Sequence, residues 1–364
     1  MSDADGNNSH RSRFARWSRA QAVAILAGFL ALVVWGLVAG TDLPADYQSS
    51  DPAMTNVGLY NAVVDKMIEG EGYYQAINES QAVRGFPTRP FPTVREPALA
   101  TVESWLGGSR PMRYVLLALL TATGVAVIVR LRSVATGRAS WLAASTLAVI
   151  SPVLFFNSES VDLNEYWAGL LVALSLACLS KTRWLFSVVV AFMAVLVREL
   201  ALPLLGAIAV YEFFRGRRQR AVVWVAVSVV FLGILMIHAA NVEHSVAPST
   251  VQSPGWLKFG GWPFFVDSVR YSSLMAVMPV AVAAIAVPLA MLGWISRQGD
   301  FANRITLVLV TYALAFMIVG RPGNFYWGFL FVVVILPGIA FAPAAFLSLY
   351  RAARPNTQDL SHVA

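Results

Sequence analysis

Two adjacent charged residues interrupt an otherwise apolar stretch of the chain. Arg198 and Glu199 stand together, with an apolar run on each side. Placing such a charge against lipid costs about 2.5–3.5 kcal/mol on membrane-insertion scales. Both side chains must therefore face each other or a polar cavity. Two interpretations stay open: a structural ion pair, or an Arg198 that a buried acid holds toward a ligand.

Other charges lie where apolar runs begin. Arg95 and Glu96 precede Pro97 at the start of a short predicted helix, where they could pair with each other or cap that helix. Glu165 precedes a longer apolar run, and a carboxylate in the first turn of a helix also offsets the helix dipole. These three residues are candidates for a polar site at the ends of the apolar segments.

A third charged position follows the apolar run at 305–320. Arg321 begins the segment Arg-Pro-Gly-Asn-Phe-Tyr-Trp, which also holds Asn324 and Tyr326. An arginine beside aromatic residues is typical of a membrane-interface anchor. A binding role for Arg321, with Asn324 and Tyr326 as hydrogen-bond donors, is the alternative.

Metal and disulfide chemistry has no visible motif in the sequence. The single cysteine, Cys178, excludes an intrachain disulfide and a cysteine-based metal cluster. The histidines never occur at the i, i+4 spacing of a zinc-binding helix. These histidines are His10, His238, His244 and His362. No metal site is predicted.

The composition indicates the environment of the elements that position these residues. Of the 364 residues 57% are hydrophobic and only 13% are charged, with a mean hydropathy of +0.63. Soluble domains carry about a quarter charged residues, so the chain belongs in a membrane. Its pI is near 9.7, but the arginines punctuate apolar runs instead of forming one basic face. No nucleic-acid partner is expected.

Apolar runs predict an all-α, polytopic integral membrane bundle with about ten transmembrane helices. The runs are Ala22–Gly40, Tyr114–Val129, Trp141–Phe156, Tyr166–Leu179, Trp184–Val197, Ala201–Phe214, Ala221–Ala240, Leu274–Ile295, Ile305–Gly320 and Phe329–Leu349. The fifth and sixth runs meet at Arg198 and Glu199. We interpret them as two spans, with one long helix as the alternative.

The distribution of Lys and Arg predicts the orientation. Basic residues gather in every other connection, and the acidic residues gather mostly in the remaining ones. The positive-inside rule then places both tails, 1–21 and 351–364, in the cytoplasm, most simply at a bacterial inner membrane. Residues 22–350 form the transmembrane domain. Its polar site would lie on the periplasmic or extracellular face.

The longest outer segment, 41–113, has its own pattern. Asp51-Pro52 predicts a helix start, and apolar residues at helical spacing then run to Gly70, as in a helix on the bilayer surface. A proline-rich extended stretch and the short helix after Pro97 follow. The other two long outer segments, 157–165 and 241–272, are interpreted as loops.

Several short phrases resemble a known family. They are Leu59-Tyr60, Gly70-Glu-Gly-Tyr-Tyr74, Phe86-Pro87, Arg95-Glu-Pro-Ala-Leu99, Asn164-Glu-Tyr-Trp-Ala-Gly-Leu-Leu171 and Arg198-Glu-Leu-Ala201. Together with the retained first span and the acidic first outer loop, they resemble the membrane glycosyltransferases of type C, the GT-C fold. The likeness is architectural over about 330 residues and specific only in these phrases.

The resemblance implies an inverting transfer of a sugar from a polyprenyl-phosphate donor to an acceptor hydroxyl of an envelope glycan, lipid or protein. One loop carboxylate would be the general base, Asp51 or in reserve Asp46. Cations would hold the donor phosphate, and other polar residues would contact sugar or acceptor. The expected cations are Arg198, Arg95 and Arg321, and the expected contacts are Glu96, Glu165, Glu199, Asn324 and Tyr326. No cofactor is evident, and relatives of this fold differ in whether they use a divalent cation.

The chain also departs from the family pattern. It has no adjacent acidic pair after the first span and no long soluble C-terminal domain. Two other functions therefore stay open: a lipid-linked sugar flippase or small-molecule transporter, and a non-catalytic subunit of an envelope assembly complex. Transporters usually place charges near the bilayer midplane, whereas here they gather at the ends of apolar runs, which favours chemistry at the surface.

Overall fold

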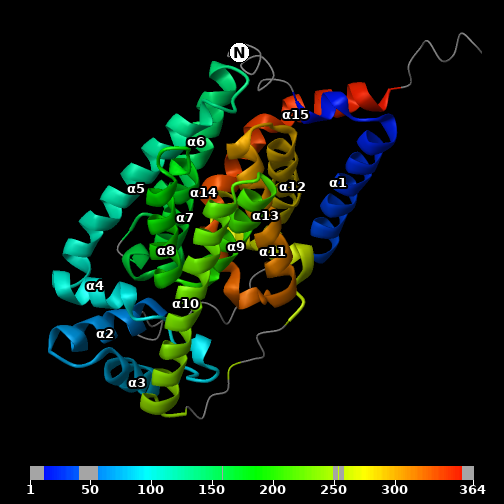
Figure 1. The fold of residues 1–364 in the computed structure, drawn as a ribbon. Coiled ribbons are helices and arrows are strands. Elements are labelled where there is room, and N and C mark those ends of the chain that lie inside the picture. Colours follow the sequence, from blue (N-terminus) through cyan, green and yellow to red (C-terminus); the bar gives the residue numbers. More distant parts are fainter. Residues whose placement is uncertain (1–11, 41–55, 158, 249–252, 254–257, 355–364) are drawn as a thin grey trace, which may run out of the picture.

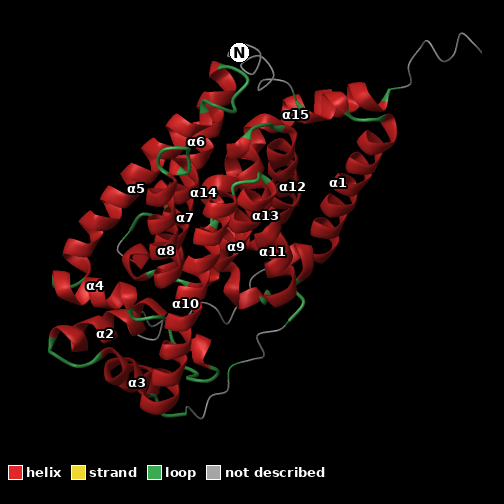
Figure 2. Ribbon diagram, viewed as in Figure 1, coloured by secondary structure: helices red, strands yellow, loops and turns green. Residues whose placement is uncertain are grey.

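The computed structural model describes residues 12–40, 56–157, 159–248, 253 and 258–354. Within these ranges the secondary structure is entirely helical, without a strand (Figure 2). Long helices form a bundle, and shorter helices cover its two ends (Figure 1). The fold class expected from the composition is thus confirmed as all-α.

Each predicted apolar run is helical over most of its length. The helices of the bundle are α1 (Arg19–Ala39), α5 (Ser109–Leu131), α6 (Arg138–Leu154), α7 (Asn164–Cys178), α8 (Trp184–Val197), α9 (Leu202–Phe214), α10 (Arg218–Ser245), α12 (Val280–Ser296), α13 (Asp300–Val319), α14 (Val332–Ile335) and α15 (Ala342–Ala353). Turns of 3-10 helix interrupt the last run, with η8 (Pro322–Leu330) and η9 (Leu336–Phe341) on either side of α14.

Five helical segments in the described part of the chain are long and apolar enough to cross a membrane. They are Arg19–Ala39, Ser109–Leu131, Arg218–Ser245, Asp300–Val319 and Val332–Ala353. Three shorter apolar helices accompany them: α6, α8 and α12. About 20 apolar residues are needed to span a bilayer. These lengths indicate an integral membrane protein.

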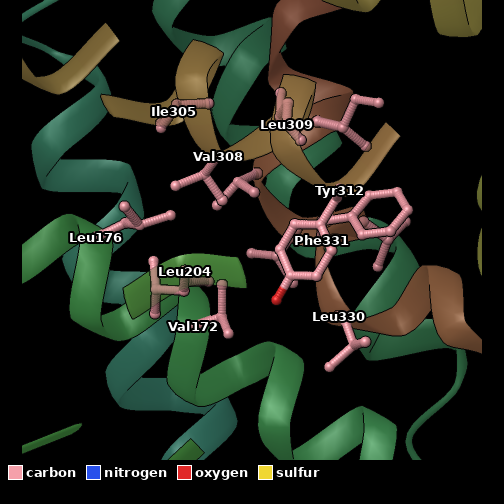
Figure 3. Close-up of a cluster of buried hydrophobic side chains, with 14 of the residues drawn as sticks. Val172, Leu176, Leu204, Ile305, Val308, Leu309, Tyr312, Leu330 and Phe331 are labelled. Atoms are coloured by element: carbon pink, nitrogen blue, oxygen red, sulfur yellow. The ribbon is translucent and has the colours of Figure 1, made fainter. Parts of the chain in front are cut away.

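The centre of the bundle is a continuous apolar core. Its side chains come from helices far apart in the sequence, mainly α7, α9, α13 and the segment around Phe331 (Figure 3). The rings of Tyr312 and Phe331 lie 5.2 Å apart at its centre. Figure 3 also labels Val172, Leu176, Leu204, Ile305, Val308, Leu309 and Leu330. This core holds in place the helix ends that carry the charged residues.

A smaller lobe covers one end of the bundle (Figure 1). It contains α2 (Asn56–Ile68), α3 (Tyr73–Arg84), η4 (Phe91–Thr93) and α4 (Ala98–Leu106). At 1.5 Å per residue, the 28 residues of α10 extend about 42 Å. The helix is therefore longer than the hydrocarbon core of a bilayer, and its last turns pack into the apolar centre of the lobe through Val242.

One expected loop is helical over half of its length. In the segment 241–272, α10 continues to Ser245, and α11 (Gly261–Tyr271) follows. Nearly every residue of α11 is buried, Trp262 included, and the helix packs against η8 and α13. The interpretation of this segment as a loop is therefore wrong for α11. Its many glycine and aromatic residues form a tight interior helix contact.

The end of the bundle opposite the lobe holds a group of polar and charged residues, which we call the α9–α13 cluster: Tyr211, Glu212, Arg217, Asp300 and Arg304. Arg304 Nη2 donates to Glu212 Oε1 at 2.7 Å. Arg217 Nη2 pairs with Asp300 Oδ2 at 2.5 Å, and the Tyr211 hydroxyl donates to Asp300 Oδ1 at 2.7 Å. These bonds tie α9, the start of α10 and α13 together.

Candidate functional site

Five charged residues meet where the lobe joins the bundle, and we call them the cavity cluster: Arg95, Glu96, Glu165, Arg198 and Glu199. Glu165 Oε1 accepts a hydrogen bond from Arg198 Nε at 2.6 Å and forms an ion pair with Arg95 Nη2 at 3.2 Å. The other side of the Arg198 guanidinium pairs with Glu199. The side chains of Arg198 and Glu165 are each only 1% exposed. The charges are therefore neutralised by one another and not by water.

Breaks in the helices bring these residues together. Arg198 lies between α8 and η6 (Glu199–Ala201) with an extended backbone (φ −154°, ψ 115°). Asn164 Nδ2 donates to the carbonyl of Val197 at 3.0 Å, so the end of α8 is capped by the start of α7. The expected break between two apolar segments at Arg198 is thus confirmed. The break turns Arg198 away from lipid and toward Glu165.

The lobe holds Arg95 from the other side. The Tyr73 hydroxyl donates to the backbone carbonyl of Arg95 at 2.6 Å, which fixes the chain just before α4. The guanidinium of Arg95 reaches the Tyr326 hydroxyl at 3.4 Å. Arg95 therefore bridges the lobe, the start of α7 and η8.

A glycine allows η8 to approach this site. A Cβ at Gly169 would lie 1.9 Å from the carbonyl oxygen of Phe329. Only glycine leaves room for the backbone of η8 against α7 at this position. The close contact sets Tyr326 beside the first turn of α7, where Glu165 lies.

In the fifth member of the cavity cluster, Glu96, the surroundings favour the protonated form of the carboxyl group. Burial raises the pKa of Glu96 well above its usual range, and the nearby charge of Glu199 raises it further. With Glu96 protonated, two arginines face two carboxylates in the cavity cluster.

A cavity of about 470 Å³ opens beside the cavity cluster. Arg95, Glu165 and Tyr326 line it. Its other polar lining residues are Asn56, Asn157, Glu159, Ser160, Asp162 and Asn164, and its aromatic lining residues are Tyr60, Phe86, Phe155, Tyr271, Phe325 and Phe329. The volume is that of a typical small-molecule site. One wall supplies a cation, and aromatic faces supply stacking surfaces.

An acidic pair lies under one wall of the cavity. Asn61 can donate from its amide nitrogen to both oxygens of Asp162, at 3.1 and 3.2 Å. Burial, together with the charge of Glu103, raises the pKa of Asp162 to about 8. Burial likewise raises the pKa of Glu103 to about 7. At neutral pH Asp162 therefore mostly carries a proton and can donate a hydrogen bond into the cavity.

The expected site residues divide into three groups. Arg95, Glu165 and Tyr326 line the cavity. Glu96, Arg198 and Glu199 pack behind this wall and are not among the described residues that line it. The remaining four are Asn324 and Arg321, which are likewise absent from the described lining, and Asp46 and Asp51, which lie outside the described residues.

Arg198 has the environment of a structural ion pair. Its Nε and Nη1 atoms bond two different carboxylates, while the side chain is 1% exposed. The alternative interpretation, direct contact of Arg198 with a ligand, would have to use Nη2, which has no hydrogen-bond partner among the described residues, and Arg198 is not among the described residues that line the cavity. Arg198 instead orients Glu165, which in turn holds Arg95 at the cavity wall.

Sequence reasoning did not single out Glu103. This residue lies in α4 on the same face as Leu99 and Ala100 and is only 2% exposed. A carboxylate within the apolar stripe of a short helix was the available signal, because such a position predicts a buried acid.

Comparison with protein-family models, with curated proteins and with solved structures found no match for this chain. Among the described residues, no group of three or more His, Cys, Asp or Glu side chains is arranged to hold a metal ion.

Proposed function

We propose that this protein is a membrane glycosyltransferase of the type C kind, which moves a sugar from a polyprenyl-phosphate donor to an acceptor hydroxyl. The observation that carries the proposal is the cavity at the junction of bundle and lobe. There Arg95, held by Glu165, stands among carboxyl, amide and aromatic side chains. A lipid phosphate needs such a cation, and a sugar needs such hydrogen-bonding and stacking groups.

Arg95 is the proposed phosphate-binding residue at the cavity wall. In the transfer, the acceptor oxygen attacks the anomeric carbon while the bond from that carbon to the phosphate oxygen breaks. The bonding electrons leave with the phosphate, and a fixed guanidinium offsets the charge that develops there. Arg198 and Glu199 act as positioning residues, because Glu199 pairs with Arg198, Arg198 holds Glu165, and Glu165 holds Arg95.

The acceptor hydroxyl must lose its proton to a carboxylate. Asp51, or Asp46 in reserve, remains the proposed base. Asp162 suits a different role, because a carboxyl with a pKa of about 8 donates a hydrogen bond at neutral pH. We assign it to a hydroxyl of the sugar or the acceptor. Arg321 remains proposed as a further phosphate contact, with Asn324 as its neighbour.

The membrane arrangement is part of the proposal. About ten spans, with both termini in the cytoplasm, would place the cavity at the periplasmic face of a bacterial inner membrane. The short helices α2, α3 and α4 would then lie at the bilayer surface. Envelope glycans, lipids and exported proteins are the acceptors available on that side.

Donor binding and transfer by the full chain in nanodiscs test the proposal. A panel of polyprenyl-phosphate sugars would be offered to the wild type and to the variants R95Q, R113Q and D51N. We expect R95Q to weaken donor binding by roughly tenfold to a hundredfold, the range for losing a charged hydrogen bond. R113Q, which changes an exposed arginine at the start of α5, serves as the matched control and should bind normally.

D51N separates binding from chemistry. It should keep donor binding and lose transfer, because the base acts only on the acceptor proton. A wild-type protein that neither binds nor consumes any polyprenyl-phosphate sugar would overturn the proposal and favour a transporter or an assembly subunit.

A further inference from the structure

A second polar pocket lies at the end of the bundle opposite the cavity, where η1 (Arg13–Arg16) meets the connection between α12 and α13. Its volume is about 310 Å³. The lining residues are Arg13, Arg16, Trp17, Gln298, Gly299 and Asn303. Figure 1 shows α15, which packs against η1, at the far end of the bundle from α2, α3 and α4. The pocket is therefore separate from the proposed catalytic site.

The two arginines are held in place by an anchored turn. Phe14, between them, is fully buried in an apolar cluster with Ala22, Leu292 and Leu349. Residues three apart lie on the same side of a 3-10 helix, so Arg13 and Arg16 share one face. With Phe14 fixed in the bundle, both cations are presented at a defined position.

The charge of Arg13 is not neutralised by its partners on the pocket wall. Arg13 Nη2 donates to the backbone carbonyl of Arg297 at 2.9 Å and also to the side-chain oxygen of Asn303. Both acceptors are uncharged, and both bonds use a single nitrogen of a group with five N–H donors. The guanidinium keeps its full charge and further donors for an anion.

The facing wall suits an anion as well. Gly299, with φ +99° and open space where a Cβ would lie, precedes the first turn of α13. The positive end of the helix dipole is found there. The nearest carboxylate on this element, Asp300, is already paired with Arg217 at 2.5 Å and Arg215 at 3.4 Å.

The pocket also lies at the depth of lipid headgroups. The segments α1 and α13 are both long and apolar enough to span a membrane, and they begin at Arg19 and Asp300, next to the lining residues Trp17 and Gly299. Two spans that start beside one pocket place it at the membrane boundary. Trp17 is half-buried there, as is usual for an interfacial tryptophan.

We propose that this pocket binds a phosphate group, and that the phosphate belongs to an anionic phospholipid of the adjoining leaflet. Arg13 and Arg16 would contact the phosphate oxygens, the geometry in which arginine binds phosphate best. Gln298 and Asn303 would bind the polar remainder of the headgroup. The bound lipid would hold η1 and the start of α13 together.

Native mass spectrometry of the full chain, titrated with phosphatidylglycerol or phosphatidylcholine, tests the site. We expect the wild type to bind a first phosphatidylglycerol more tightly than phosphatidylcholine. R16Q should weaken that preference roughly fivefold, and R13Q with R16Q should weaken it further, since each arginine near the surface contributes comparably. R16K, which keeps the charge, should retain most of it.

A control variant and a competition with inorganic phosphate complete the test. The matched control is R218Q, which removes an exposed arginine at the start of α10, outside the pocket, and it should leave the preference unchanged. Equal loss in R218Q and R16Q, or equal binding of both lipids by the wild type, would overturn the proposal. Inorganic phosphate that displaces phosphatidylglycerol at equal concentration would overturn the lipid assignment and indicate a site for free phosphate.

Discussion

The two buried charged clusters of this protein both consist of arginine–carboxylate ion pairs, but their surroundings differ. In the α9–α13 cluster, Arg304 bonds both Glu212 and the carbonyl of Leu179, at 2.7 and 2.9 Å, and Glu212 is fully buried. The cavity cluster instead borders open space, with Arg95 and Glu165 on the wall of a cavity of about 470 Å³. Ion pairs that are enclosed between helices hold those helices together, whereas ion pairs beside a cavity can also contact a ligand.

The balance of charge differs in the same way. The cavity cluster holds three carboxyl groups and two arginines, and burial raises the pKa of Glu96 well above its usual range. In the α9–α13 cluster the two carboxylates each meet arginine nitrogens, from Arg304, Arg217 and, at the rim, Arg215. A cation at a cavity wall is a feature of a binding site, whereas ion pairs enclosed between helices are a feature of a scaffold.

The largest expected effect comes from breaking the α9–α13 cluster. R304A would leave the carboxylate of Glu212 buried without its closest partner, and such a loss costs about 3–5 kcal/mol of stability. Thermal unfolding in detergent should show a large fall in Tm. Any variant protein that still folds should bind the proposed polyprenyl-phosphate donor as the wild type does. Reduced donor binding in folded R304A would mean that the two clusters are not separate in function.

The acidic pair under the cavity predicts an intermediate, pH-dependent effect. The pKa of Asp162 is about 8 in the folded protein, above the value near 4 in an unfolded chain. Between these values the folded protein holds more protons, so its stability falls as the pH rises from about 4 to 8. D162N removes this loss of stability. The Tm of D162N minus that of the wild type should therefore increase by roughly 2 °C or more as the pH rises from about 4 to 8.

The matched control for D162N is E159Q. Glu159 is an exposed carboxylate that lines the same cavity. Its replacement should leave the pH dependence of the Tm unchanged. If the difference in Tm between D162N and the wild type stays constant from pH 5 to pH 8.5, the prediction that Asp162 is protonated in the folded protein is wrong.

The smallest expected effect concerns the contact between Arg95 and Tyr326. At 3.4 Å this hydrogen bond is long, so Y326F should cost well under about 1 kcal/mol of stability. Donor binding should fall by less than roughly threefold, since Glu165 still holds Arg95. A loss as large as that of R95Q would show that Tyr326 itself contacts the donor.

Much of the fold could be predicted because hydropathy is a local property. Each apolar run is helical, and the segment 184–197 was predicted with the bounds that α8 has. The helix break at Arg198 was also predictable, since a charged pair cannot continue an apolar helix through lipid at low cost. Helix α3 and the buried helix α11 were missed. Their sequences are polar or rich in glycine and aromatic residues, and packing decides their conformation.

The sequence alone determined that this chain lives in a membrane, where its apolar segments lie and which charges need partners. Only the tertiary structure decided the partners: Arg198 meets Glu165 across 33 positions, and Arg95 reaches the same carboxylate from the lobe. A buried charge must be neutralised, and any opposite charge satisfies that requirement. Which opposite charge comes into contact depends on how the helices pack, through contacts such as the close approach of η8 that Gly169 allows.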